Sequence, residues 1–316
     1  MSAPAVAHDP ASSGRVHVGN YLARDGGSKP IELAYDVFGS KGRPLVLVMG
    51  IGAQRIFWDV ELCERFVAAG FQVVRFDHRD TGESTRLDAA VPAPWPMLAR
   101  RLVGAHIAAP YTLSDMAHDV VGLLDGLGLA DAHVLGASLG GMVGQHLAIE
   151  HAARVRSLTA IMTSPGARRF MPKPRAMRAL FSPRPTTAEQ AGLHMESLFT
   201  TLGSTAWHVD RERLRRLGAE AFARGMNPRG FLRQFAAVLA SGDRRPRLRT
   251  LEVPTLVVHG SQDPMFPLSA GRTLAHLVPH ATWLPVAGMG HDLPAPLWPT
   301  LVAAVTRHAT RADARR

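Results

Sequence analysis

The clearest chemical signal in this chain of 316 residues is a serine framed by glycines, GASLG at residues 136–140. A short apolar run from His133 precedes it, and apolar residues follow it at helical spacing. The pattern predicts a strand, a sharp turn and a helix, with the Ser138 hydroxyl held above a sheet. Side chains at Gly136 and Gly140 would collide with neighbouring backbone. Ser138 is therefore the candidate nucleophile, although a Gly/Ser turn without chemistry fits the same residues.

A serine hydroxyl becomes an effective nucleophile when a histidine accepts its proton and a carboxylate orients that histidine. Asp263 follows the apolar run 254–259, and His291 follows the run 281–286. Both lie at the predicted carboxyl ends of strands, where open α/β sheets bind their ligands. The chain order Ser138, Asp263, His291 therefore predicts a Ser-Asp-His triad.

The elements that must position these residues alternate between strands and helices, which is typical of a parallel sheet covered on both faces. Strands are predicted at residues 16–23, 31–38, 44–49, 71–76, 133–137, 155–162, 254–259 and 281–286. The first two flank an Asp-Gly-Gly turn and are expected to pair antiparallel. The expected fold class is α/β, with the α/β-hydrolase arrangement of a mostly parallel eight-stranded sheet, covering helices and an inserted helical cap.

The domain organisation follows from where the strand patterns stop. Residues 166–250 show helical patterns only, and we interpret them as the cap; residues 16–165 and 251–310 form the core. Residues 1–15 have little apolar periodicity and are expected to be a disordered lead-in. The loop 85–110, rich in proline and alanine, is expected to edge the active site.

Composition narrows the possible partners. The formal charge is +10, but residues 166–250 contain 17 Lys and Arg and only 6 Asp and Glu, so the excess of positive charge belongs to this one segment. We interpret it as the solvated face of arginine-rich helices. The single cysteine, Cys63, leaves no multi-cysteine metal site. No apolar run is long enough to span a membrane. We therefore expect a cytoplasmic protein with no metal, cofactor, nucleic-acid or membrane partner; the oligomeric state stays open.

Four segments carry a family resemblance: residues 49–54, 74–84, 136–141 and 288–294. The chain, over about residues 16–310, resembles the α/β-hydrolases and, more closely, the serine esterases similar to aclacinomycin methylesterase. The resemblance implies an oxyanion hole made by the backbone N–H groups of Ile51 and Leu139. Met49 stands where the wider family usually has histidine, which should alter loop packing only. The loop 77–84 is expected to be mainly structural.

The expected reaction is cofactor-independent hydrolysis of a small-molecule carboxylic ester through an acyl-enzyme. The cap and the strand-end loops are rich in methionine, which adapts to varied apolar ligands, so we expect a bulky apolar substrate such as a methyl ester of a polycyclic acid. The residues expected to contact it are Gln54, Met162, Phe199, Met265 and Met289. Two other interpretations stay open. One is an acyltransferase or cofactor-free perhydrolase with the same triad; the other is a non-catalytic ligand-binding homologue.

Overall fold

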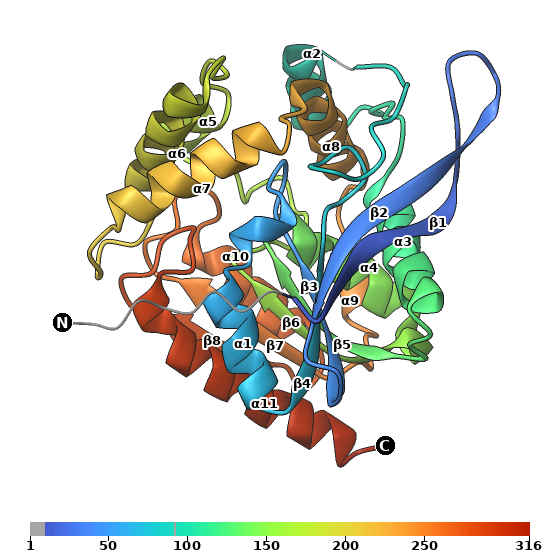
Figure 1. The fold of residues 1–316 in the computed structure, drawn as a ribbon, viewed down its shortest axis with the longest axis vertical. Helices are drawn as coiled ribbons and strands as arrows, with labels where there is room; N and C mark the ends of the chain where they lie inside the picture. Colours follow the sequence, from blue (N-terminus) through green and yellow to red (C-terminus); the bar gives the residue numbers. More distant parts are fainter. Residues whose placement is uncertain (1–9, 92) are drawn as a thin grey trace.

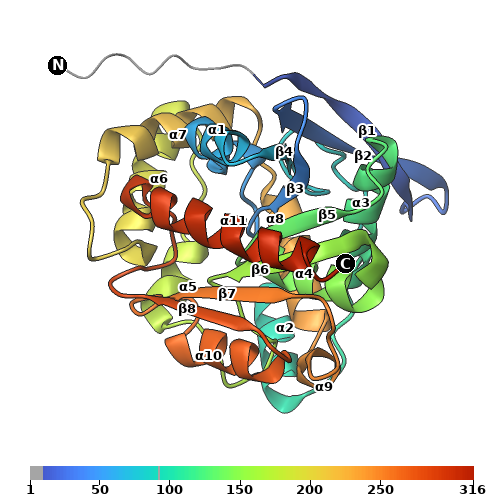
Figure 2. The ribbon, with the colours of Figure 1, turned by 90° about the horizontal axis from the view of Figure 1, so that it is seen from below.

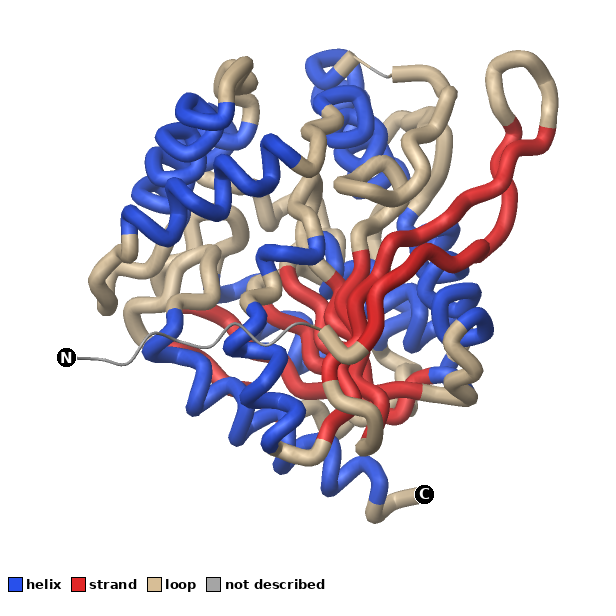
Figure 3. Tube along the Cα trace, in the orientation of Figure 1, coloured by secondary structure: helices blue, strands red, loops and turns tan. Residues whose placement is uncertain are grey.

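The structure is a computed structural model that describes residues 10–91 and 93–316. Its centre is an eight-stranded sheet in the order β1-β2-β4-β3-β5-β6-β7-β8 (Figures 1 and 3). β1 pairs antiparallel with β2, and β2 with β4, whereas the remaining pairs are parallel. The predicted fold class is confirmed. The strands are β1 (Ser12–Leu22), β2 (Ser28–Phe38), β3 (Arg43–Val48), β4 (Phe71–Phe76), β5 (Ala132–Ala137), β6 (Val155–Ile161), β7 (Thr255–Gly260) and β8 (Thr282–Val286).

Helices cover both faces of the sheet, with α1 and α11 on one face and α3, α4 and α10 on the other (Figures 1 and 2). The α-helices are α1 (Val60–Ala68), α2 (Pro94–Val103), α3 (Leu113–Gly126), α4 (Leu139–Glu150), α5 (Pro174–Leu180), α6 (Ala188–Leu202), α7 (Arg211–Ala223), α8 (Pro228–Ala240), α9 (Arg245–Leu248), α10 (Leu268–Leu277) and α11 (Trp298–Asp313). Short 3-10 turns occupy Arg55–Phe57, Ala152–Arg154 and Ala295–Leu297. Every residue of β5 and β7 is buried, as two-sided coverage requires.

The N-terminal hairpin begins earlier than predicted. β1 starts at Ser12 because residues 12–15 pair with residues 34–37 of β2, so they belong to the sheet and not to the expected lead-in. Residues 1–9 of that lead-in lie outside the described residues. Pairing with β2 determines where this edge strand begins, because residues 12–15 have no apolar pattern of their own that would predict a strand.

Between β6 and β7 the structure describes every residue, and this stretch contains helices α5 to α9 without a strand. In Figure 1 these helices run from yellow to orange, with α5, α6 and α7 together and α8 beside α2. We use the word cap for residues 166–250, as in the sequence-based division. Among the described helices, none combines the length and apolar character needed to cross a bilayer.

Candidate active site

Ser138 occupies the turn between β5 and α4 with φ 55° and ψ −115°. A residue with a side chain holds such a conformation only where its surroundings enforce it. Thr163 donates a hydrogen bond to the Ser138 carbonyl oxygen at 2.7 Å. A Cβ on Gly136 would collide with the Gly140 carbonyl, and a Cβ on Gly140 with the Val48 carbonyl. The predicted turn and the need for its two glycines are confirmed.

The structure brings the three predicted triad residues together from three strand ends. Nε2 of His291 lies 3.0 Å from Oγ of Ser138, and Nδ1 of His291 lies 2.9 Å from Oδ2 of Asp263. Oδ1 of Asp263 accepts hydrogen bonds from the backbone N–H groups of Met265 and Phe266 at 2.7 and 2.9 Å. A carboxylate anchored in this way holds the proton on Nδ1 and leaves Nε2 free to accept one. The arrangement can therefore take the hydroxyl proton of Ser138.

Two other titratable groups lie beside the triad. His259 forms a hydrogen bond through Nε2 to the Phe266 carbonyl oxygen at 3.0 Å, and burial lowers its pKa. Burial also raises the pKa of Asp292, which accepts a hydrogen bond from the Ser204 hydroxyl at 2.5 Å. Both side chains are engaged in local structure, which supports the interpretation of His259 as a strand-end structural residue.

The loop after β3 passes close to the nucleophile, since a Cβ on Gly50 would lie 3.5 Å from Cβ of Ser138. Neither the Ile51 nor the Leu139 N–H donates to a backbone carbonyl within the described residues. Leu139 is also the first residue of α4, where free N–H groups and the positive end of the helix dipole meet. This geometry is compatible with the oxyanion hole, which stays a prediction.

A residue that the sequence does not single out holds the loop after β3. Gln234 in α8 is fully buried and accepts a hydrogen bond from the Gly52 N–H at 2.8 Å. Its Nε2 donates to the Arg79 carbonyl oxygen at 2.9 Å and to the Thr81 hydroxyl at 2.8 Å. Because both ends of the amide are bonded, its orientation is set, and the cap thereby fixes the peptide that follows Ile51.

The cap also holds the loop that carries the histidine. The His291 N–H donates to the Leu202 carbonyl oxygen at the end of α6, at 2.7 Å. The Gly290 N–H donates to the Ser204 hydroxyl at 3.0 Å, and that hydroxyl donates to Asp292. The cap is therefore part of the framework that positions the histidine, which no local sequence pattern indicated.

Gln54 does not face the substrate region, so its prediction is wrong. Its Nε2 donates to the Ala221 carbonyl oxygen at 2.7 Å, and its Oε1 accepts from Nε of Arg224 at 2.8 Å. The last carbonyls of a helix need donors from outside the helix, and Gln54 supplies one to the end of α7. The side chain is 4% exposed and fastens the cap to the core.

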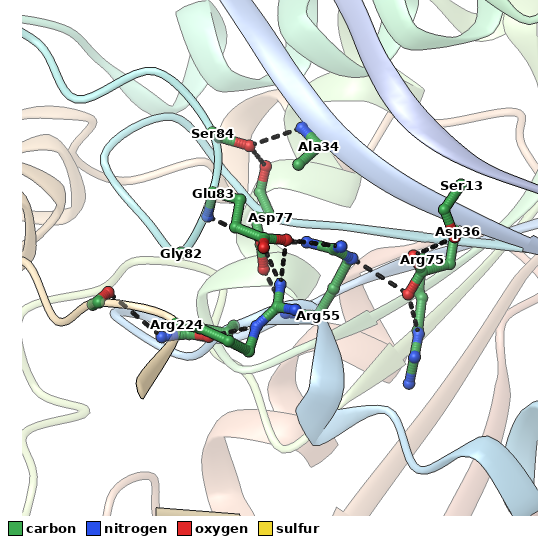
Figure 4. A network of polar contacts seen from close by, with 12 residues as sticks. Ser13, Ala34, Asp36, Arg55, Arg75, Asp77, Gly82, Glu83, Ser84 and Arg224 are labelled. Atoms are coloured by element: carbon green, nitrogen blue, oxygen red, sulfur yellow. Dashed lines mark hydrogen bonds and ion pairs between the residues drawn. The ribbon is translucent and has the colours of Figure 1, made fainter. Parts of the chain in front are cut away.

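Arg224 also belongs to a buried network of charged side chains, which is drawn in Figure 4. Asp77, with no exposed side-chain surface, contacts Nη1 of Arg55 at 2.5 Å and Nη2 of Arg224 at 3.1 Å. Arg55 also contacts Asp36 at 3.0 Å and Glu83 at 2.7 Å. These contacts support the structural interpretation of the loop 77–84 and tie the end of α7 to β2 and β4.

Two of the cavities in the described part of the chain contain Ser138. The larger, about 320 Å³, is also lined by His291 and by three of the residues predicted to contact substrate, Met162, Phe199 and Met265. The smaller measures about 100 Å³. Substrate contact by these residues stays a prediction.

Met289 lines neither of the two cavities, so its prediction is wrong. It has no exposed surface and packs into the core between the sheet and α11, because the loop 288–291 turns this side chain inward. Its carbonyl oxygen accepts a hydrogen bond from the Gln262 N–H at 2.9 Å, which joins the acid loop to the histidine loop.

One group of metal-ligand residues occurs within the described residues: His118, Glu150 and His151. It lies at the end of α4 opposite Ser138, roughly 18 Å along the helix. Glu150 already accepts hydrogen bonds there from His146 and Arg247. The group has no geometric connection to the triad.

Comparison with known proteins places the chain in a family. It matches the alpha/beta hydrolase fold family over residues 43–294 and belongs to that family. Rhodomycin D methylesterase DnrP of Streptomyces peucetius is 30% identical over 294 residues, covering 85% of this chain and 91% of that protein. RutD of Caulobacter segnis, provisionally named a carbamate hydrolase, is 31% identical over 267 residues, covering 82% and 89%. The meta-cleavage product hydrolase CumD of Pseudomonas fluorescens shares the fold, with a TM-score of 0.67, 20% identity and coverage of 93% and 97%.

Proposed function

We propose that the protein hydrolyses small-molecule carboxylic esters through an acyl-enzyme on Ser138. The observation that carries the proposal is the line of contacts from Oγ of Ser138 through the His291 ring to Asp263, at 3.0 and 2.9 Å. Relatives named as methylesterases and, provisionally, as carbamate hydrolases support a hydrolase of ester or carbamate bonds.

In this mechanism His291 takes the hydroxyl proton while Oγ of Ser138 forms a bond to the ester carbonyl carbon. The carbonyl oxygen becomes an oxyanion that accepts hydrogen bonds from the N–H groups of Ile51 and Leu139. When the tetrahedral intermediate collapses, the alkoxide leaves with the proton held by His291. A water molecule then repeats the sequence on the acyl-enzyme and releases the acid, while Asp263 stays ionised throughout. Protein groups and water supply every step, so the proposal calls for no cofactor.

The larger cavity supports a bulky apolar substrate. Its volume of about 320 Å³ compares with the roughly 150 Å³ that accommodates benzene, so it has room for roughly two fused rings. Met195 and Phe199 of α6 line it together with Met162 and Met265 of the strand-end loops. We infer that the cap selects the substrate and that a methyl ester of a polycyclic acid belongs to the accepted class.

The test is a series of p-nitrophenyl esters from acetate to decanoate, with a polycyclic methyl ester and a p-nitrophenyl carbamate beside them. Two added methylenes should raise kcat/KM by up to roughly tenfold until the cavity is full. A steady decline from acetate, with no turnover of the polycyclic ester, would contradict the apolar substrate. Parallel reactions with added alcohol or peroxide separate hydrolysis from acyl transfer and perhydrolysis. Failure of a fluorophosphonate to label Ser138 would favour a non-catalytic binding protein.

A further inference from the structure

Helix α2 exposes an apolar surface in the described part of the chain. Trp95, Leu102 and Val103 keep 69%, 67% and 79% of their surface exposed, and Met171, in the loop after β6, keeps 41%. Trp95 and Leu102 are seven residues apart, about two helical turns, so they project from the same side of α2. We name these four residues the α2 face. Grouped exposed apolar side chains mark contact sites more often than scattered ones do.

Positive charge borders the α2 face. Arg100 and Arg101 lie on α2, and Arg168 donates a hydrogen bond to the Leu102 carbonyl oxygen at 3.3 Å, which places the loop after β6 beside the helix. Burial and the neighbouring Arg168 charge lower the pKa of Arg101, and the nearby Asp243 is itself paired with Arg245 at 2.6 Å.

The segments that form this surface carry no compensating charge of their own. Residues 89–114 and 151–188 contain no Asp or Glu. The surface therefore combines exposed Trp, Leu, Val and Met side chains with uncompensated arginines.

We propose that the α2 face docks on an anionic lipid surface. Apolar side chains flanked by arginines are the arrangement with which amphipathic helices enter the headgroup region of charged membranes. A second copy of the chain would bring two arginine groups together, which is repulsive. A nucleic acid would leave Leu102 and Val103 in contact with water. The sequence-based expectation of no membrane partner rested on the lack of a spanning segment, and docking from one side needs none.

Docking would have a consequence for substrate access. Arg168 and Met171 are exposed, and both also line the smaller cavity that contains Ser138. The rim of that cavity therefore belongs to the surface that meets the lipid. An ester dissolved in the lipid surface could then reach Ser138 without crossing bulk water. This consequence rests on the proposed esterase function, whereas the docking does not.

The docking is tested by co-sedimentation of the full-length Ser138→Ala variant with vesicles of phosphatidylcholine alone or mixed with phosphatidylglycerol. Binding is expected with the anionic vesicles and at least about tenfold weaker without them. Trp95→Ser combined with Leu102→Ser should lower the partition coefficient by at least about tenfold, and Arg100→Gln, at an exposed arginine of α2, by about fivefold. The matched control is Leu22→Ser, which alters an equally exposed side chain, 75% accessible, at the end of β1.

Several results would overturn the docking. These are no binding to anionic vesicles, binding that survives Trp95→Ser with Leu102→Ser, and an equal loss in Leu22→Ser. A dimer in sedimentation velocity that Trp95→Ser dissociates would assign the face to a second copy instead. Binding to heparin as strong as to vesicles, unchanged by Trp95→Ser, would indicate attraction to any polyanion. Vesicle binding without ester hydrolysis by the wild type would count against the proposed function and leave docking intact.

Discussion

The hydrogen bond between Gln234 and Gly52 predicts that a change in the cap slows the reaction without touching substrate. Gln234→Met nearly keeps the side-chain volume but removes the acceptor of the Gly52 N–H at 2.8 Å. The bond between Gly52 and Gln234 is part-buried, and losing its acceptor costs up to about 1–3 kcal/mol, so the loop should shift to reach another partner and carry the Ile51 N–H with it. Losing one oxyanion donor outright lowers kcat by about 10²–10³, and a displaced donor should lower it by about 10- to 100-fold.

The assay is kcat and KM for one p-nitrophenyl ester, with Tm measured for each variant. KM should change by less than about threefold, because the lost interaction acts on the transition state. Thr81→Val is the matched control: it removes one partner of the Gln234 amide at 2.8 Å and leaves the bond to Gly52. Its Tm should fall while its kcat stays within about threefold of wild type. Equal kcat losses in both variants, or wild-type kcat in Gln234→Met, would refute the positioning role.

Three further predictions, one of them with a matched control variant, concern other parts of the structure. Asp77→Asn leaves Arg55 buried with fewer carboxylate contacts, so it should lower the free energy of unfolding, measured by urea titration, by about 3 kcal/mol. The control Glu61→Gln removes an exposed ion pair and should change that free energy by less than about 0.5 kcal/mol. Similar losses in the two variants would contradict the stabilising role of the buried network. Asp263→Asn should lower kcat by about 10⁴ by favouring the wrong imidazole tautomer, and a harmless substitution would mean that another carboxylate is the acid. Burial lowers the pKa of His78 to about 4, below its unfolded value of about 6.5. The contribution of neutral His78 to the free energy of unfolding is therefore complete above about pH 6.5 and is lost as the pH falls toward 4, by up to about 1.4 kcal/mol per pH unit. His78→Asn should remove this pH dependence. Parallel curves of unfolding free energy against pH for the wild type and the variant would contradict this.

Much of the fold followed from patterns within single segments. β5 and β7 are continuously buried, and their apolar runs showed it. The triad was predictable because each member lies in the turn or loop after a strand, and parallel strands bring their carboxyl ends to one edge. The glycines beside Ser138 were informative for a steric reason that the structure reproduces.

The incorrect predictions concern side chains whose direction depends on distant partners. Gln54 follows the oxyanion loop in sequence, but its amide binds Ala221, 167 residues away. Met289 lies beside His291, yet it packs inward on the core. Gln234 lies in an amphipathic helix whose pattern reports only that one side is buried, so its contact with Gly52 had no local signal.

The most direct test of the esterase account is Ser138→Ala assayed beside the wild type, with fluorophosphonate labelling followed by intact and peptide mass. One adduct per wild-type chain is expected, located on Ser138, and none on the variant. In Ser138→Ala, kcat should fall by several orders of magnitude, roughly 10⁴-fold or more, at unchanged Tm, because the nucleophile acts as a unit with His291 and Asp263. A folded Ser138→Ala variant that retains more than about a tenth of wild-type kcat would contradict the account.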